Sequence, residues 1–172
     1  MKSWKHRFVS VIACLVLLTG CAFADVVNRD ELSPEDFEQA MTDAGLEIQD
    51  HTEEAQESLE DVTVNSCLVA IGSATDSEGI EVTYTIEYYQ FANRGQAVMY
   101  YLDICDELEI RADKLRNSSY THKSAGNYNI DTYKTEVTQS IVSQVGATVV
   151  YSDVFNTDIS EPKEIIGNIG YK

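Results

Sequence analysis

The chain contains four cysteines, whose thiols are the groups best suited to covalent chemistry. Two of them lie well inside the chain, Cys67 in a segment typical of a β-strand and Cys105 on the apolar stripe of a predicted helix. A free thiol buried among apolar groups behaves as a small hydrophobic group, whereas two thiols in an oxidising compartment can be joined as a disulfide. Both alternatives stay open for Cys67 and Cys105, because the sequence defines no distance between them.

Histidines and carboxylates are the other candidates for catalysis or metal binding. His51 lies in a strongly acidic segment, interpreted here as a solvated loop because no second histidine follows at a metal-binding spacing. A nucleophilic pair of Cys105 with His122 is disfavoured, since a buried thiol is unreactive. Asp103 and Asp106 share one face of a predicted helix, as the carboxylates of acidic proteins often do. The sequence has neither a G-x-S-x-G elbow nor a phosphate-binding glycine loop, and it predicts no metal and no catalytic residue.

The N-terminal residues have the pattern of an export signal. Lys2, Lys5 and Arg7 precede an uncharged and mostly apolar run over residues 8–18. A basic segment followed by a short apolar one is typical of a signal peptide. A membrane-spanning helix is disfavoured, because it needs about 20 apolar residues. We therefore predict a signal peptide over residues 1–20.

Cys21 follows this run directly, in the sequence Leu18-Thr19-Gly20-Cys21. These four residues resemble the lipobox of bacterial lipoproteins. The resemblance implies that the sulfur of Cys21 receives a diacylglyceryl group and that cleavage between Gly20 and Cys21 makes this cysteine the new N-terminus. Two acyl chains anchor a protein stably, so the expected location is the outer face of the cell membrane, or of the outer membrane where the host has two. Secretion with cleavage after Ala24 is the disfavoured alternative, because the lipobox lies nearer the end of the apolar run.

The charge balance excludes one class of function. The 172 residues include 12 Lys and Arg against 29 Asp and Glu, and the formal net charge is −17. The predicted signal peptide holds three of the basic residues and no acidic one, so residues 21–172 have nine basic residues and a net charge of −20. Nucleic-acid binding is excluded, since affinity for phosphates depends on a basic surface. With 44% hydrophobic residues, the chain is also too apolar to be a disordered acidic protein.

The remaining chain is predicted to be one α+β domain on a short tether. Residues 21–32 have no sustained periodicity and form the tether, whereas residues 33–172 form the domain. We expect an antiparallel sheet built from hairpins, with helices packed on one face. The order of helices and hairpins also suggests a duplicated helix–hairpin unit. The expected helices start near Ser33, Asn93 and Pro162, and the expected strands cover residues 62–71, 80–91, 119–123, 132–145 and 147–155.

Ten tyrosines, all after residue 21, are the best candidates for a binding surface. A tyrosine has a broad apolar ring and a polar tip, which suits it to recognition. Tyr89, Tyr120, Tyr128 and Tyr133 are the candidates for this surface, because their positions do not assign them to the core. Tyrosine is also an ordinary strand residue, and that interpretation is favoured.

Part of the domain has a second resemblance. Residues 142–151, with Ile169-Gly170-Tyr171, are similar to small uncharacterised bacterial surface lipoproteins. This resemblance implies a fold and a location but no activity. We expect a membrane-anchored, extracytoplasmic, non-enzymatic binding or accessory module, whose partner beyond the membrane is an envelope protein or a glycan. The alternatives are an envelope enzyme using carboxylate or cysteine chemistry and a structural envelope protein. No cofactor is expected beyond the diacylglycerol on Cys21.

Overall fold

The computed structural model describes residues 28–115 and 117–171. The predicted signal peptide, its cleavage site at Gly20, the lipid-attachment site Cys21 and the first part of the predicted tether lie outside these residues. No helix within the described part of the chain is long and apolar enough to cross a membrane. The elements are α2 (Pro34–Asp43), β1 (Glu47–Asp50), α3 (Thr52–Ser58), β2 (Val64–Thr75), β3 (Glu81–Phe91), α4 (Arg94–Asp113), β4 (Ser119–Ala125), β5 (Tyr128–Lys134), β6 (Gln139–Val145), β7 (Thr148–Val154) and α5 (Glu161–Asn168).

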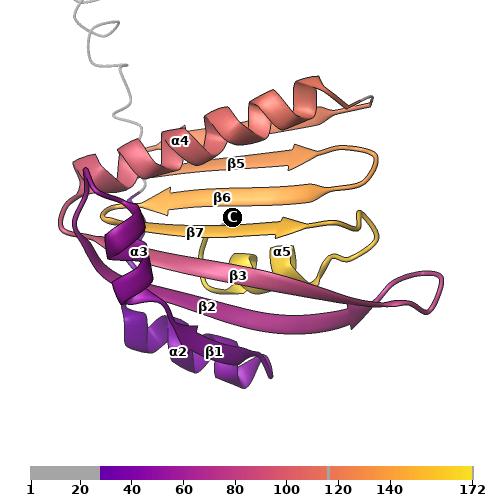
Figure 1. Cartoon of the computed structure of the whole chain (residues 1–172), viewed down its shortest axis with the longest axis horizontal. Coiled ribbons are helices and arrows are strands. Elements are labelled where there is room, and N and C mark those ends of the chain that lie inside the picture. Colours follow the sequence, from indigo (N-terminus) through magenta and orange to yellow (C-terminus); the bar gives the residue numbers. More distant parts are fainter. Residues whose placement is uncertain (1–27, 116, 172) are drawn as a thin grey trace, which may run out of the picture.

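These strands form one sheet in the order β1-β2-β3-β7-β6-β5-β4, and every neighbouring pair is antiparallel (Figure 1). Hairpins join β2 to β3, β4 to β5 and β6 to β7. In the β6–β7 turn Gly146 has a φ of +55°, which glycine adopts without strain. The pairing of β3 with β7 joins the two halves of the sheet. The predicted α+β class and the antiparallel hairpin sheet are confirmed.

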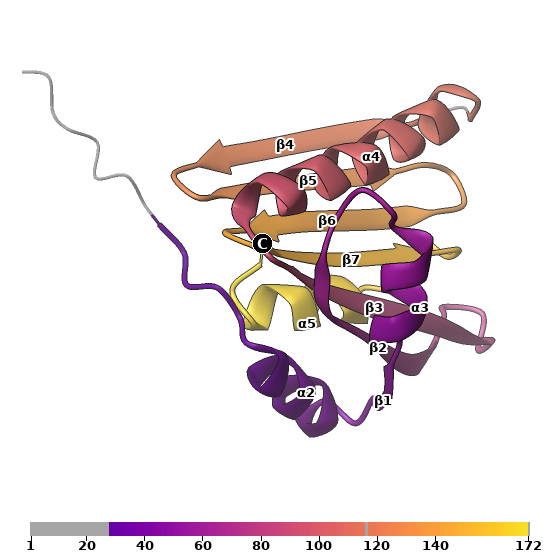
Figure 2. The same ribbon diagram turned by 60° about the vertical axis from the view of Figure 1, so that its left-hand side comes forward.

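Helices cover both faces of the sheet, and here the expectation of helices on one face is corrected. α3 and α4 lie on one face, called the α4 face, and α2 and α5 lie on the other, called the α5 face (Figures 1 and 2). Side chains alternate between the faces along a strand. Val142 and Val149 therefore pack in the core of the α4 face, whereas Ile141 and Val150 pack in that of the α5 face. The central strands are apolar on both sides because each side has its own core.

The two longest predicted helices have the expected capping residues. The Ser33 hydroxyl accepts a hydrogen bond from the Asp36 N–H at 3.1 Å, and the Asn93 side chain accepts one from the Gln96 N–H at 3.2 Å. The Gln96 side chain accepts from the Thr63 N–H at 3.2 Å, and this bond links the start of α4 to the chain entering β2.

Two segments differ from the sequence prediction. The strand expected over residues 132–145 is broken into β5 and β6. The break is stabilised by Thr135, whose Oγ1 accepts from the Thr138 N–H at 2.9 Å and lies 2.9 Å from the Thr138 hydroxyl. α3 was not predicted, since its sequence is acidic and has no helical apolar period; it begins where Asp50 accepts from the Thr52 N–H at 2.9 Å.

The halves of the described chain are not matching copies, so the suggested duplication has no counterpart in the topology. α2 precedes β1, β2 and β3 and lies on the α5 face, whereas α4 precedes β4, β5, β6 and β7 and lies on the opposite face. α3 is inserted in the first half only.

The segment before α2 is bonded to distant parts of the chain. Arg29 and Asn127 exchange two hydrogen bonds, from the Arg29 N–H to the Asn127 side chain at 2.9 Å and from that side chain to the Arg29 carbonyl at 2.8 Å. The Leu32 N–H donates to the Tyr171 hydroxyl at 3.1 Å, and the Tyr88 hydroxyl donates to the Leu32 carbonyl at 2.7 Å. This part of the predicted tether therefore lies against the folded domain.

Candidate functional site

A carboxylate on β5 lies in the core of the α4 face. Asp131 is paired with Val142 of β6 and with His122 of β4, and Val142 belongs to that core. Cross-strand neighbours share a face, so the Asp131 side chain points beneath α4, where the residue is 3% exposed. A charged group buried this deeply must be hydrogen-bonded.

Four side chains from two elements bond to this carboxylate, and with Asp131 they form what we call the Asp131 cluster. From α4, the Tyr101 hydroxyl and the Cys105 thiol donate to Oδ2, the thiol at 3.2 Å. From β4, the Tyr120 hydroxyl donates to Oδ1 at 2.7 Å, and the His122 Nδ1 lies 2.7 Å from the same oxygen. The donors come in pairs because residues four apart share a helix face and residues two apart share a strand face.

The environment of Cys105 makes its thiol a donor. Burial raises the pKa of this thiol to about 12, and the hydrogen bond to Asp131 acts in the same direction. The thiolate is the nucleophilic form of cysteine, so Cys105 is unreactive near neutral pH. The structure does bring Cys105 and His122 to one carboxylate, but they bond to different oxygens. Burial also raises the pKa of Tyr101 and Tyr120, and both hydroxyls therefore remain protonated donors.

A pocket of about 370 Å³ lies beside the Asp131 cluster, between the C-terminal end of α4 and the strands β4 and β5. We call it the tyrosine pocket. Tyr120, which is 54% exposed, and the buried Tyr133 contribute their rings, whose centroids are 4.8 Å apart at an angle of 37°. The polar lining comes from Glu109 and Asp113 of α4 and from the serines that precede and begin β4. The pocket thus combines aromatic rings with carboxylates and hydroxyls.

The other two candidate tyrosines lie elsewhere. Tyr89 of β3 is on the α4 face but far along it, where its ring is 4.6 Å from that of Tyr100 and its hydroxyl donates to Glu87 at 2.8 Å. Tyr128 lies on the α5 face, with the Arg29 guanidinium 4.1 Å from its ring centroid. The structure therefore brings together Tyr120 and Tyr133 and separates Tyr89 and Tyr128 from them.

Cys67 and His51 line a different hollow, of about 290 Å³, between α3 and the α4 face. Burial raises the pKa of the Cys67 thiol to about 11. Cys67 and Cys105, which the sequence left open to a disulfide, are both free and buried in the structure. Within residues 28–115 and 117–171, no three His, Cys, Asp or Glu side chains are arranged to hold a metal ion.

Asp131 is the functional candidate that sequence reasoning missed. The sequence contains only a weak sign of this site. Asp131 stands two residues before Tyr133, so its side chain lies on the same face of β5 as a buried aromatic residue. An acidic residue in a core-facing register indicates a buried polar cluster. The core-facing position of Asp131 can be recognised only when the first and last residues of β5 are known. The polar composition of residues 117–131 gave no sign of where this strand begins.

Comparison of the chain with protein-family models, with curated proteins and with solved structures finds no match.

Proposed function

We propose that the protein is a lipid-anchored, non-enzymatic binding module of the cell envelope and that its tyrosine pocket binds a glycan. The observation that carries this proposal is the pairing of Tyr120 and Tyr133 in a pocket with two carboxylates. The lipid anchor follows from the resemblance of residues 18–21 to a lipobox. An anchored domain acts on what lies within reach of the membrane surface, and envelope glycans are abundant there.

The pocket has the chemistry that a sugar requires. A pyranose ring has an apolar C–H face, which packs against aromatic rings, and a rim of hydroxyls, which bond to carboxylates and hydroxyl groups. Tyr120 and Tyr133 would receive the apolar face, and Glu109 and Asp113 would accept from the hydroxyls. At about 370 Å³ the pocket is near the lower end of the range for small-molecule sites, which suits one or two sugar rings.

The Asp131 cluster supports binding by fixing the exposed ring of this pocket. Because the Tyr120 hydroxyl is bonded to Asp131, its ring is held in place before any ligand arrives. A preordered side chain loses less conformational entropy when it binds. Asp131 is thus a positioning residue in this proposal, and its two oxygens are already occupied by four donors.

Binding is tested with the mature chain purified in neutral detergent and titrated with N-acetylglucosamine oligosaccharides. We expect Y120A to weaken binding about tenfold or more, as the loss of an aromatic anchor does. Y120F should retain most of the affinity, because the ring remains. F155A is the matched control, since Phe155 is an aromatic residue that is 75% exposed and does not line the tyrosine pocket. Equal affinities of Y120A and the unmodified chain would exclude the pocket as the glycan site.

The anchor has its own test, mass spectrometry of the mature N-terminus. The proposal predicts an acylated Cys21, and it predicts that C21S abolishes acylation and membrane retention. An unmodified N-terminus at Asp25 would instead indicate ordinary secretion.

One observation favours a second function, acid–base catalysis on a bound glycan. The His122 ring is 44% exposed, and its Nδ1 is held by Asp131 at 2.7 Å, an arrangement that orients an imidazole for proton transfer. Under this alternative the chain releases shorter oligosaccharides from the same probes, and H122Q abolishes the release without weakening binding. Intact oligosaccharides after prolonged incubation would exclude it.

A further inference from the structure

A second groove lies on the α5 face, over the end of the sheet that α5 leaves open. α5 packs against β3 and β7, whereas β4, β5 and β6 form the floor of this groove, which has a volume of about 360 Å³. Three lysines line it: Lys123 of β4, Lys134 of β5 and Lys163 of α5. We call it the lysine groove.

The strand register places these groups together. Ser119 is paired with Lys134, and Thr121 with Thr132, so hydroxyls lie beside and between the lysines. Thr132 is paired in turn with Ile141, which belongs to the core of the α5 face. All these residues therefore share that face. Lys163 projects from the first turn of α5 and completes the wall.

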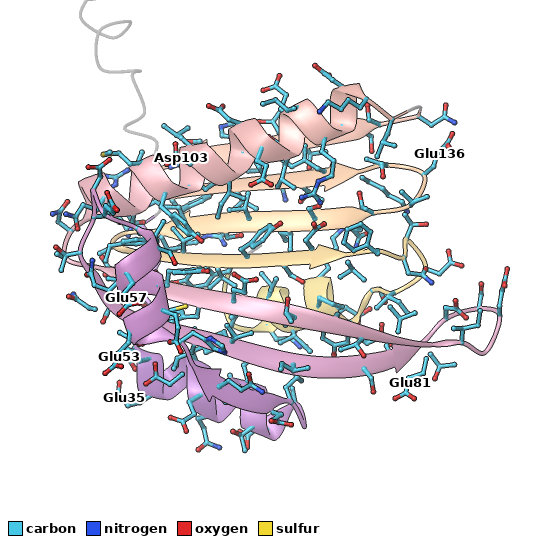
Figure 3. The ribbon with its side chains drawn as sticks, viewed as in Figure 1. Glu35, Glu53, Glu57, Glu81, Asp103 and Glu136 are labelled. Atoms are coloured by element: carbon cyan, nitrogen blue, oxygen red, sulfur yellow. The ribbon has the colours of Figure 1, made fainter. Side chains whose placement is uncertain are left out.

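The concentration of positive charge contrasts with the rest of the molecule. Only nine basic residues remain after residue 20, against 29 acidic ones, yet three of the nine line one groove. Within the described residues none of the three forms an ion pair. Acidic side chains point outward elsewhere around the molecule, from α2, α3, β3, α4 and the turn after β5 (Figure 3). The labelled examples are Glu35, Glu53, Glu57, Glu81, Asp103 and Glu136.

Protection of a sheet edge explains only part of this arrangement. β4 is an edge strand, and a lysine on such a strand discourages pairing with another chain. That accounts for Lys123. Lys134 lies on β5, which is paired on both sides, and Lys163 lies on a helix. α5 also has Glu161 and Glu164 beside Lys163, but neither forms an ion pair with a lysine of the groove. Like charges that converge repel one another, and such a cluster attracts an anion.

We propose that the lysine groove binds a phosphate group carried on an organic skeleton. A phosphate has up to two negative charges and three strong acceptor oxygens, which matches three ammonium groups supported by hydroxyls. The groove is far larger than a phosphate ion, and its floor includes Ile130 and Ile141, which suit the carbon skeleton of the ligand. The inference does not depend on glycan binding, because the tyrosine pocket lies on the opposite face.

The test measures how fast each lysine is acylated, using the mature chain in neutral detergent and a low dose of an N-hydroxysuccinimide ester. The soluble probe is sn-glycerol 3-phosphate, with glycerol as the matched control at the same ionic strength. We expect Lys123, Lys134 and Lys163 to react about fivefold more slowly at a probe concentration that occupies most of the sites. Lys114, which is exposed and lies just after α4, should react at an unchanged rate.

A second arm identifies the source of the phosphate. The chain is reconstituted in phosphatidylcholine vesicles with or without phosphatidylglycerol. Protection of the groove lysines by phosphatidylglycerol alone assigns the site to lipid headgroups, and protection by glycerol 3-phosphate assigns it to soluble or polymeric phosphates. In either case K134Q should reduce the protection of Lys123 and Lys163. Unchanged rates in every arm, or slowing that Lys114 shares, would overturn the proposal.

Discussion

Replacing Asp131 by alanine lowers the free energy of unfolding by about 3–5 kcal/mol, the usual loss when one partner of a buried charged network is removed. The carboxylate is the acceptor for the buried donors Tyr101 and Cys105, and each would be left unsatisfied at a loss of about 1–3 kcal/mol. Domains of this size are stable by only about 5–15 kcal/mol. A single substitution on β5 should therefore remove a large share of the stability.

The measurement is urea denaturation followed by tyrosine fluorescence and circular dichroism. Tyrosine is a suitable probe, because the only tryptophan, Trp4, lies in the predicted signal peptide. D131N should lower the free energy of unfolding by less than D131A does, about 1–3 kcal/mol, since the amide keeps one acceptor oxygen. D103A is the matched control, an exposed aspartate on the outer side of α4 whose removal should change stability by less than about 0.5 kcal/mol. Similar urea midpoints for D131A and D103A would show that the Asp131 cluster does not stabilise the fold.

Raising the pH from about 8 to 10.5 should lower the free energy of unfolding by roughly 5 kcal/mol through the two buried thiols alone. In the folded state burial raises the pKa of Cys67 to about 11 and that of Cys105 to about 12, whereas an unfolded thiol titrates near 8.5. Above that pH the unfolded chain releases the two protons and the folded chain keeps them. The unfolded state then binds fewer protons, so stability falls as the pH rises. This contribution is fully present below about pH 8.5 and is lost as the pH rises towards 11 and 12.

Urea midpoints between pH 7.5 and 10.5, measured in the presence of a reductant, test this dependence. The double variant C67A/C105A should show a much flatter curve up to about pH 9, above which the buried tyrosines begin to contribute. Without reductant, the unmodified chain should give the same curve, because its two thiols are free. A curve that is flat without reductant and steep with it would reveal a Cys67–Cys105 disulfide.

The helices and strands predicted correctly are those in which the order of polar and apolar residues matches the exposure of their side chains. α2 and α4 have a cap and an apolar stripe, and β3 alternates polar and apolar residues from Glu81 to Tyr88 because its two faces differ in exposure. The sequence also contains a sign that helices cover both faces of the sheet. This sign is the consecutive apolar pairs Ile141-Val142 and Val149-Val150, whose members pack in different cores. A strand that is buried on both faces has such runs in place of alternation.

The sites could not be predicted in the same way, because each is assembled by strand pairing. Asp131 meets Cys105 and His122 only when β4 pairs with β5 and α4 packs over β5. Lys123 and Lys134 converge with Lys163 only because α5 returns to the same face of the sheet. No spacing along the chain carries this information. The sequence does show that the thiols and tyrosines are present, but not which of them share a pocket.

Under the proposed anchor at Cys21, the bonds that hold residues 29–32 have a mechanical consequence. A pull from the membrane would enter the fold first at Arg29, whose backbone is bonded to Asn127 in the β4–β5 turn. It would then reach Leu32, which is bonded to Tyr88 of the inner strand β3 and to Tyr171 near the other end of the chain. Tyr171 is bonded in turn to Thr148 at the start of β7. The load would thus be shared between the β4–β5 hairpin at one edge and the two strands at the middle of the sheet. Such a linkage resists unzipping, because the edge hairpin does not carry the force alone.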